Sequence, residues 1–311
     1  MRRLPFSSVV MVFLVAGCSG MVSDLGADRP DSSLSPSDAG GPSDAGTRTD
    51  AGPSPSDAGG PTDAGTSADA GRSDAGLPVD AGRDTFMPCP TGTTACRIMP
   101  LGDSITDGVP VGGGYRVELF HLSNADKRAI TFVGSQTNGP ATVDGLQFPQ
   151  HHEGHSGYTI DTIGGRSGIY PLVQQSLTTY TPHIVLLMIG TNDVSIGADL
   201  ANAPKRLGLL LDRITTTSPN ALVVVAKLIP STDDSMNNNV RTYNTGVAQV
   251  VEQRVAAGKH LLLVDMYETF TANPSFKTQW MSDWLHPTTD GYAAMARTWY
   301  PTIKPFLAPG P

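Results

Sequence analysis

Five short apolar runs constrain the fold of this chain more than any other feature of its sequence. The runs lie at residues 97–101, 130–134, 183–189, 221–229 and 260–266, and turn-forming residues bound them. Segments whose apolar residues recur every three or four positions lie between or after them, at 115–122, 160–177, 200–214, 240–257 and 288–300. Strands that alternate with helices form parallel, doubly wound sheets, in which central strands are apolar throughout because both faces are buried. The pattern therefore predicts one α/β domain over residues 88–311, with a central parallel sheet of about five strands.

The N-terminal end of the chain has the pattern of an export signal. Two arginines follow Met1, and a short apolar stretch then ends in Val15-Ala16-Gly17-Cys18, as in secretory signals. This apolar stretch is too short to form a stable membrane-spanning helix. The last four residues are similar to the signal of bacterial lipoproteins, whose cysteine becomes the lipidated first residue of the mature chain. We therefore predict a signal peptide over residues 1–18 and a lipid anchor at Cys18. An ordinary signal peptide with an incidental cysteine is the alternative, because the motif is short.

Residues 19–87 have a composition that does not support a packed core. The triplet Asp-Ala-Gly occurs eight times between Asp38 and Gly82, and residues 19–87 carry twelve aspartates against four arginines. With so few apolar side chains to bury, nothing offsets the entropy cost of ordering this part of the chain. We predict a disordered linker. A calcium-binding repeat is the weaker alternative, because the aspartates lack the flanking ligands of such repeats.

The remaining residues, 88–311, carry nearly balanced charge, with 15 basic and 17 acidic side chains. This balance gives no electrostatic reason to expect a nucleic-acid partner or an anionic membrane surface. The only membrane contact that we expect is the lipid anchor at Cys18. Cys89 and Cys96 lie at the start of this region, and in an exported protein we expect them to form a disulfide. A zinc site is less well supported, because no second cysteine pair is present to complete it.

Polar residues with catalytic potential follow the apolar runs. Gly102-Asp103-Ser104 follows the first run, Gly190-Thr191-Asn192-Asp193 the third and Asp283-Trp284-Leu285-His286 the last, and a further loop spans residues 154–158. Ligand sites of parallel α/β sheets lie at the carboxyl ends of the strands, so these loops should meet. Together they supply a serine, a base, a carboxylate and hydrogen-bond donors, as acyl transfer to a serine requires. Taken singly, four of these residues are also common turn or helix-cap residues, namely Asp103, Ser104, Asn192 and Asp283.

These blocks resemble those of the SGNH, or GDSL-type, hydrolases. The matching residues are Gly102-Asp103-Ser104-Ile105-Thr106, Gly157, Gly190-Thr191-Asn192-Asp193 and Asp283-x-x-His286, in the family's order and over essentially all of residues 97–305. The longer strings GDSITDG, EGHSGYTI and DWLHPTTDGY are more narrowly similar to family 3 of the carbohydrate esterases, which includes acetylxylan esterases. The resemblance implies a three-layer α/β/α, flavodoxin-like fold.

The resemblance also implies a role for each matching residue. Ser104 would be the nucleophile, His286 the general base and later the general acid, and Asp283 the carboxylate that orients His286. The oxyanion donors would be the backbone N–H groups of Ser104 and Gly157 and the side-chain amide of Asn192. Asp283 and His286 are three positions apart, so one helical turn or a tight loop places both side chains on one face.

Two other serines and a histidine-rich segment offer competing interpretations. The strings GHSGY and GRSGI, around Ser156 and Ser167, are close to the nucleophile elbow of α/β-hydrolases but lack its second glycine. Four ionisable side chains lie together at His151, His152, Glu153 and His155. The metalloprotease motif H-E-x-x-H would need a histidine at position 156, and the nearby glycines favour a loop over a helix. We therefore expect no metal and no cofactor, and we expect this loop to shape the substrate cleft.

The resemblance and the predicted export together favour an enzyme that acts in the cell envelope or outside the cell. We predict a secreted or lipid-anchored serine esterase that removes acetyl groups from xylan or a similar polysaccharide through an acyl-enzyme. We expect it to act as a monomer, with Asp103, His155 and Trp284 contacting the substrate. One alternative is a broad-specificity GDSL lipase or arylesterase, which would also cleave long-chain esters. The other is a non-catalytic carbohydrate-binding protein, which would retain acetylated polysaccharide without releasing acetate.

Overall fold

A computed structural model describes residues 86–309. The predicted signal peptide, Cys18 and nearly all of the predicted linker lie outside the described residues. Phe86 already packs on the folded region, because its ring stacks on that of His260 with 3.6 Å between the ring centroids. The packed region therefore begins slightly before the predicted boundary at residue 88.

The strands of the described region form a mostly parallel sheet. They are β1 (Cys96–Gly102), β2 (Ile130–Phe132), β3 (Gln136–Thr137), β6 (His151–Gly154), β7 (Ile184–Met188), β8 (Leu222–Lys227) and β9 (Leu261–Asp265), and a separate small sheet pairs β4 (Thr142–Val143) with β5 (Leu146–Gln147). The main order is β3-β6-β1-β7-β8-β9, and only the β3–β6 pairing is antiparallel. Every residue of β7 is buried, as expected of a strand covered on both faces.

The first strand has two partners along the same side. β2 pairs with its first half, from Cys96 to Ile98, and β6 pairs with its last two residues, Leu101 and Gly102. β2 and β6 therefore share one position beside β1, so the parallel part of the sheet has the order of a flavodoxin-like fold. The predicted α/β fold is confirmed.

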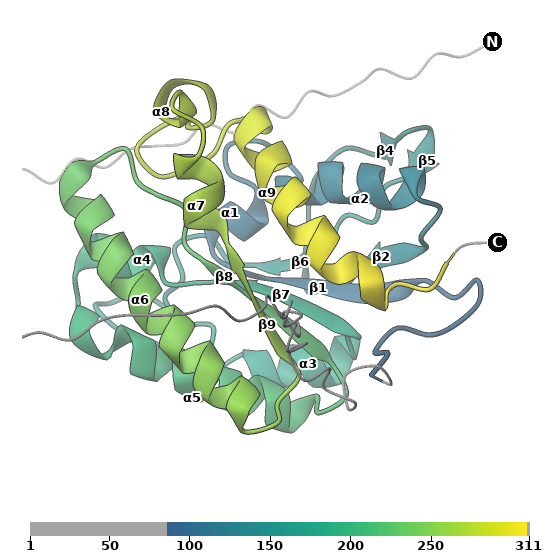
Figure 1. Cartoon of the computed structure of the whole chain (residues 1–311), viewed down its shortest axis with the longest axis horizontal. Helices are drawn as coiled ribbons and strands as arrows, with labels where there is room; N and C mark the ends of the chain where they lie inside the picture. Colours follow the sequence, from purple (N-terminus) through teal and green to yellow (C-terminus); the bar gives the residue numbers. More distant parts are fainter. Residues whose placement is uncertain (1–85, 310–311) are drawn as a thin grey trace, which may run out of the picture. The chain divides into compact units, whose positions relative to one another are not determined.

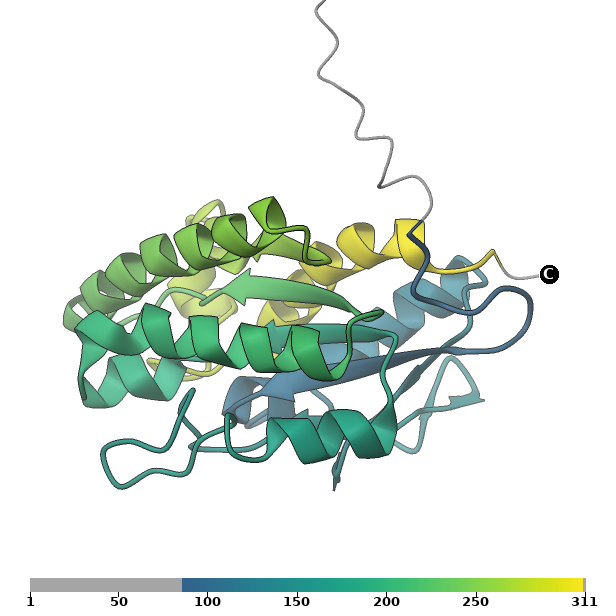
Figure 2. The same cartoon turned by 90° about the horizontal axis from the view of Figure 1, so that it is seen from below.

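Helices cover both faces of the sheet. They are α1 (Ser104–Asp107), α2 (Tyr115–Ala125), α3 (Val173–Tyr180), α4 (Thr191–Ile196), α5 (Ala203–Thr217), α6 (Asp234–Ala256), α7 (Met266–Thr271), α8 (Phe276–Gln279) and α9 (Thr289–Ile303), with short 3-10 turns at Leu200–Asn202 and Lys304–Phe306. Helices α2 and α9 pack together on one side of the sheet, and α3, α5 and α6 lie on the other (Figures 1 and 2). No described helix is long and apolar enough to cross a membrane.

The predicted helix over residues 160–177 is wrong in its first half. Only Val173–Tyr180 is helical, and the preceding segment folds back on itself, with an antiparallel bridge between Ile163 and Arg166. Gly164 and Gly165 both have positive φ, 59° and 76°, a conformation that a right-handed helix does not contain and that glycine adopts without strain. The apolar residues Ile160 and Ile169 are buried from a loop instead of from a helix face.

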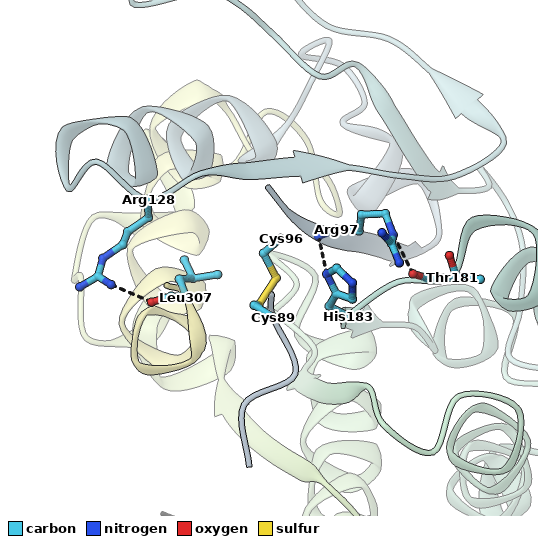
Figure 3. Close-up of a disulfide and its surroundings, with 7 residues drawn as sticks. All are labelled: Cys89, Cys96, Arg97, Arg128, Thr181, His183 and Leu307. Atoms are coloured by element: carbon cyan, nitrogen blue, oxygen red, sulfur yellow. Dashed lines mark hydrogen bonds between the residues drawn. A yellow bond between two sulfur atoms is a disulfide. The ribbon is translucent and has the colours of Figure 1, made fainter. Parts of the chain in front are cut away.

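A disulfide joins Cys89 to Cys96 at the start of β1, with 5.1 Å between the two Cα atoms (Figure 3). Beside it, the Arg97 N–H donates to Nδ1 of His183 at 3.0 Å, and the Arg97 side chain donates to the carbonyl of Thr181 at 2.9 Å. These contacts fix the amino end of β1. Seven residues of strand, about 20 Å, separate this end from the loop that carries Ser104.

Candidate active site

Ser104 lies at the carboxyl end of β1, as the first residue of helix α1. Asp103 caps this helix by accepting a hydrogen bond from the Ile105 N–H at 3.0 Å. The last residue of β1, Gly102, must be glycine, because a Cβ at this position would lie 2.2 Å from the Met188 carbonyl oxygen. Ser104 is 7% exposed, so the turn buries most of this residue at the carboxyl end of β1.

A chain of hydrogen bonds links Ser104, His286 and Asp283. Ser104 Oγ lies 3.0 Å from His286 Nε2, and His286 Nδ1 lies 2.8 Å from Asp283 Oδ2. The second oxygen of Asp283 accepts hydrogen bonds from the backbone N–H groups of Leu285 and His286, both at 2.6 Å. Burial raises the pKa of Asp283, but these backbone bonds and the His286 side chain outweigh it and leave the pKa below its usual value. Asp283 is therefore ionised at neutral pH and fixes the tautomer in which His286 Nε2 can accept the serine proton.

The loop after β6 brings a second set of donors to the same edge. Gly157 has a φ of +82°, which favours glycine because a Cβ would be strained there. Asn192, on α4 after β7, donates from Nδ2 to the carbonyl of Tyr158 at 2.8 Å. The Ser104 N–H belongs to the first turn of α1, where a helix N–H has no intrahelical acceptor. The structure therefore brings together the three segments whose donors were predicted from the sequence.

Asp193, on α4, joins this loop to Arg206 on α5. Asp193 is fully buried, and its carboxylate accepts hydrogen bonds from the Ile160 N–H and from the Arg206 guanidinium, both at 3.0 Å. Burial raises the pKa of Asp193, and the bonds from Ile160 and Arg206 offset this only in part. Loss of Arg206 would leave an uncompensated carboxylate in the protein interior. Arg206 was not predicted from the sequence, because it lies in an ordinary helical segment.

The predicted substrate contact of Asp103 finds no support in its surroundings, because the Asp103 side chain is fully buried. Asp103 turns inward to cap α1. Burial raises its pKa to about 6, although the hydrogen bond from the Ile105 N–H works in the opposite direction. Asp103 supports the turn that carries Ser104.

The histidine-rich segment has separate partners for its side chains. His155 Nε2 lies 2.9 Å from Glu153 Oε1, and Glu153 also accepts bonds from Ser135 and Ser176. The Nδ1 atom of His152 accepts a hydrogen bond from the Gly154 N–H at 3.1 Å. Within residues 86–309, no three His, Cys, Asp or Glu side chains are grouped so as to hold a metal ion.

The His155 side chain packs on other residues of its own loop, whereas Trp284 is exposed to solvent. The His155 ring is turned toward the buried Glu153 and stacks on the Tyr158 ring with 5.0 Å between centroids. The Trp284 side chain is 47% exposed, and its carbonyl accepts a hydrogen bond from Ser231 Oγ at 2.7 Å. The chain around Trp284 is thus fixed while its ring remains accessible, two residues from His286. A substrate contact at Trp284 stays a prediction.

The family model described as GDSL-like Lipase/Acylhydrolase matches residues 101–294, more than half of the chain. The chain therefore belongs to the GDSL-like lipase/acylhydrolase family, which is the family that its sequence motifs resemble.

The individual proteins that this chain resembles include esterases. A multidomain esterase of Ruminococcus flavefaciens is 31% identical over 228 residues, which cover 68% of this chain and 29% of that protein. A solved family 3 carbohydrate esterase of Clostridium thermocellum is 32% identical, with a TM-score of 0.58 over 68% of this chain and 98% of that one. A family 3 carbohydrate esterase of Talaromyces cellulolyticus, at 23% identity and a TM-score of 0.55, covers 68% of this chain and 97% of that one and shares the fold. The chain spans between 29% and 51% of the length of the curated relatives that it matches.

Proposed function

We propose that this protein is a serine esterase that removes acetyl groups from xylan or a similar polysaccharide through an acyl-enzyme. The observation that carries the proposal is the continuous chain of hydrogen bonds from Asp283 through His286 to Ser104. A serine hydroxyl becomes an effective nucleophile only when a positioned base can take its proton, and this geometry supplies such a base.

The first half of the reaction forms the acetyl-enzyme. Ser104 Oγ attacks the acetyl carbonyl carbon while His286 Nε2 takes the serine proton, and the carbonyl oxygen becomes negatively charged. The N–H groups of Ser104 and Gly157 and the amide of Asn192 stabilise this oxyanion. The tetrahedral intermediate then collapses, the bond between the acetyl carbon and the sugar oxygen breaks, and His286 returns the proton to that oxygen. The sugar is released with a free hydroxyl group, and the acetyl group remains on Ser104.

The second half releases acetate. His286 takes a proton from a water molecule, whose oxygen attacks the acetyl carbon. The bond to Ser104 Oγ then breaks, and the proton passes from His286 to the serine oxygen. Asp283 keeps the imidazole oriented and stabilises its charged form in both halves, without itself taking the proton.

Two observations support a carbohydrate ester as the substrate. The similarity to family 3 carbohydrate esterases extends over most of the described domain. The exposed ring of Trp284 lies two residues from His286, and aromatic side chains offer a flat apolar face with a polar edge to a ligand. The apolar face of a sugar ring can pack on such a surface while its ester is held at Ser104.

The test is acetate release from acetylated xylan, measured beside a series of p-nitrophenyl esters from acetate to octanoate. We expect release of acetate and a strong preference for the acetate ester over octanoate. Ser104→Ala should abolish both activities. Ser167→Ala is the matched control, since Ser167 is another serine of the domain that takes no part in the chain of hydrogen bonds from Asp283 to Ser104. A preference for octanoate would favour a lipase. Binding of acetylated xylan with no acetate released would favour a carbohydrate-binding protein.

We also propose that the enzyme is exported and held in the cell envelope by a lipid at Cys18. The support for this proposal is the signal-like sequence that ends in Val15-Ala16-Gly17-Cys18. One acyl chain gives only marginal membrane binding, so stable anchoring would need more than one. The wild-type protein should then fractionate with membranes, and Cys18→Ser should move it to the soluble fraction. Equal solubility of the two proteins would contradict the anchor.

A further inference from the structure

Asp107 joins the helix of the nucleophile to the loop that carries the Gly157 N–H. It is the last residue of α1, and its Oδ2 accepts a hydrogen bond from Ser156 Oγ at 2.6 Å. Ser156 directly precedes Gly157, so the peptide group between them contains the Gly157 N–H. One side-chain contact therefore ties the position of this N–H to the segment that carries Ser104.

A partly buried network of hydrogen bonds fixes the Asp107 carboxylate. Asn138 Nδ2 donates to Asp107 Oδ1 at 2.5 Å and to the Asp107 carbonyl at 2.9 Å. The Asn138 oxygen accepts from the Gly113 N–H at 3.0 Å and from the Arg116 guanidinium, so the amide cannot turn over without losing both bonds. Arg116 is fully buried and also donates to the carbonyl of Gln150 at 3.0 Å. Asp107 is thus a fixed acceptor to which Ser156 is attached.

The backbone on either side of Ser156 is held by other contacts. The His155 N–H donates to the Gly102 carbonyl at 2.9 Å, and the Tyr158 carbonyl accepts from Asn192 at 2.8 Å. These bonds keep the loop folded, but neither involves the peptide group between Ser156 and Gly157. Ser156 is exposed, and removing an exposed side chain changes stability little. The hydroxyl of Ser156 is therefore placed to control the orientation of one peptide group more than the stability of the fold.

We propose that Asp107 and Ser156 are positioning residues, whose hydrogen bond sets the distance between the Gly157 N–H and Ser104 Oγ. The inference rests on the proposed function, because it assigns the Gly157 N–H to the oxyanion of the esterase reaction. A donor stabilises the oxyanion only when it is already aimed at the place where charge develops. With the bond lost, the peptide group can rotate, and the enzyme must reorient it during each reaction. Substrate binding before the reaction does not use this donor, so the effect falls on kcat and not on KM.

The experiment compares three variants of the full chain, Ser156→Ala, Ser156→Thr and Ser167→Ala, on p-nitrophenyl acetate. Direct removal of an oxyanion donor lowers kcat by about 10² to 10³, and Ser156→Ala leaves the donor present but loosely held, so we expect a loss on the order of tenfold. KM should change less than about twofold. Ser156→Thr keeps the hydroxyl and should restore most of kcat. The control Ser167→Ala removes a hydroxyl that forms no hydrogen bond to another described residue, and kcat should stay at the wild-type value.

A double-mutant cycle with Asp107→Ala tests whether the two residues act through each other. If they do, Ser156→Ala should lower kcat no further in the Asp107→Ala background. Additive losses would overturn the inference, and so would a Ser156→Ala variant with wild-type kcat or with a raised KM at unchanged kcat. In each of these cases Ser104→Ala remains inactive if the proposed function is right. Full activity of Ser104→Ala would instead refute the proposed function itself.

Discussion

The buried imidazole of His152 predicts a specific dependence of stability on pH. His152 lies on β6 and is 1% exposed. Because Nδ1 accepts the bond from the Gly154 N–H, the proton of the neutral ring is on Nε2. Burial first, and then the nearby charge of Arg116, lower the pKa of His152 to about 3. The ring therefore stays neutral in the folded protein at pH values where a histidine in the unfolded chain is protonated.

The size and sign of the effect follow from the two pKa values. A histidine in an unfolded chain has a pKa of about 6.5, so the unfolded state binds more protons than the folded state between about pH 6.5 and 3. Stability rises with pH wherever the unfolded state binds more protons, so here it is lost as the pH falls below about 6.5. At about 1.4 kcal/mol per pKa unit, a change from about pH 7.5 to about pH 4.5 should remove about 2.7 kcal/mol through His152 alone.

The assay is urea unfolding of the wild type and His152→Asn at those two pH values, with the disulfide intact. Asparagine keeps an acceptor near the position of Nδ1 and cannot titrate. The stability advantage of the wild type over the variant should shrink by about 2.7 kcal/mol at the lower pH. The comparison cancels other groups that titrate in this range, and His151→Asn, at an exposed position of the same strand, controls for loss of a histidine. An advantage that is equal at both pH values would refute the reasoning that His152 is buried in its neutral form.

Three further predictions concern the oxyanion site, its support and the disulfide. Asn192→Ala should lower kcat for p-nitrophenyl acetate by roughly 10² to 10³ with little change in KM; early melting with wild-type kcat would assign Asn192 to the fold instead. Arg206→Met should lower the free energy of unfolding by roughly 3 to 5 kcal/mol, since it leaves Asp193 buried without its cation; a loss below about 1 kcal/mol in urea unfolding would contradict this. Replacing Cys89 and Cys96 by serine should cost roughly 2 to 3 kcal/mol of stability, given their separation of seven positions. The thermal midpoint should fall at unchanged kcat, because the disulfide lies at the end of β1 away from Ser104, and a large loss of kcat would speak against that separation.

The sequence determined those features that depend on residues close together in the chain. Apolar runs such as 183–189 predict buried strands, because a strand covered on both faces has no polar side to show. The blocks around Ser104 and Asn192 could be placed at strand ends for the same reason, since the turn residues that follow each run mark where the strand stops. The block around His286 lies farther on, because α7 and α8 separate it from β9. The spacing of Asp283 and His286 likewise allowed a contact that needs only one short turn of chain.

Which loops contact one another depends on how the strands and helices assemble in three dimensions. Ser156 and Asp107 are 49 positions apart, and nothing in the neighbourhood of either residue indicates the other. The burial of Asp103 and the pairing of Asp193 with Arg206 likewise depend on which elements cover the strand ends. The segment 160–177 has helical spacing, but a folded-back loop forms there because its glycines allow positive φ and Asp193 binds the Ile160 N–H. In each case the deciding contact joins residues that become neighbours only when the parallel strands are assembled in order, because the sheet brings loops far apart in the chain to one edge.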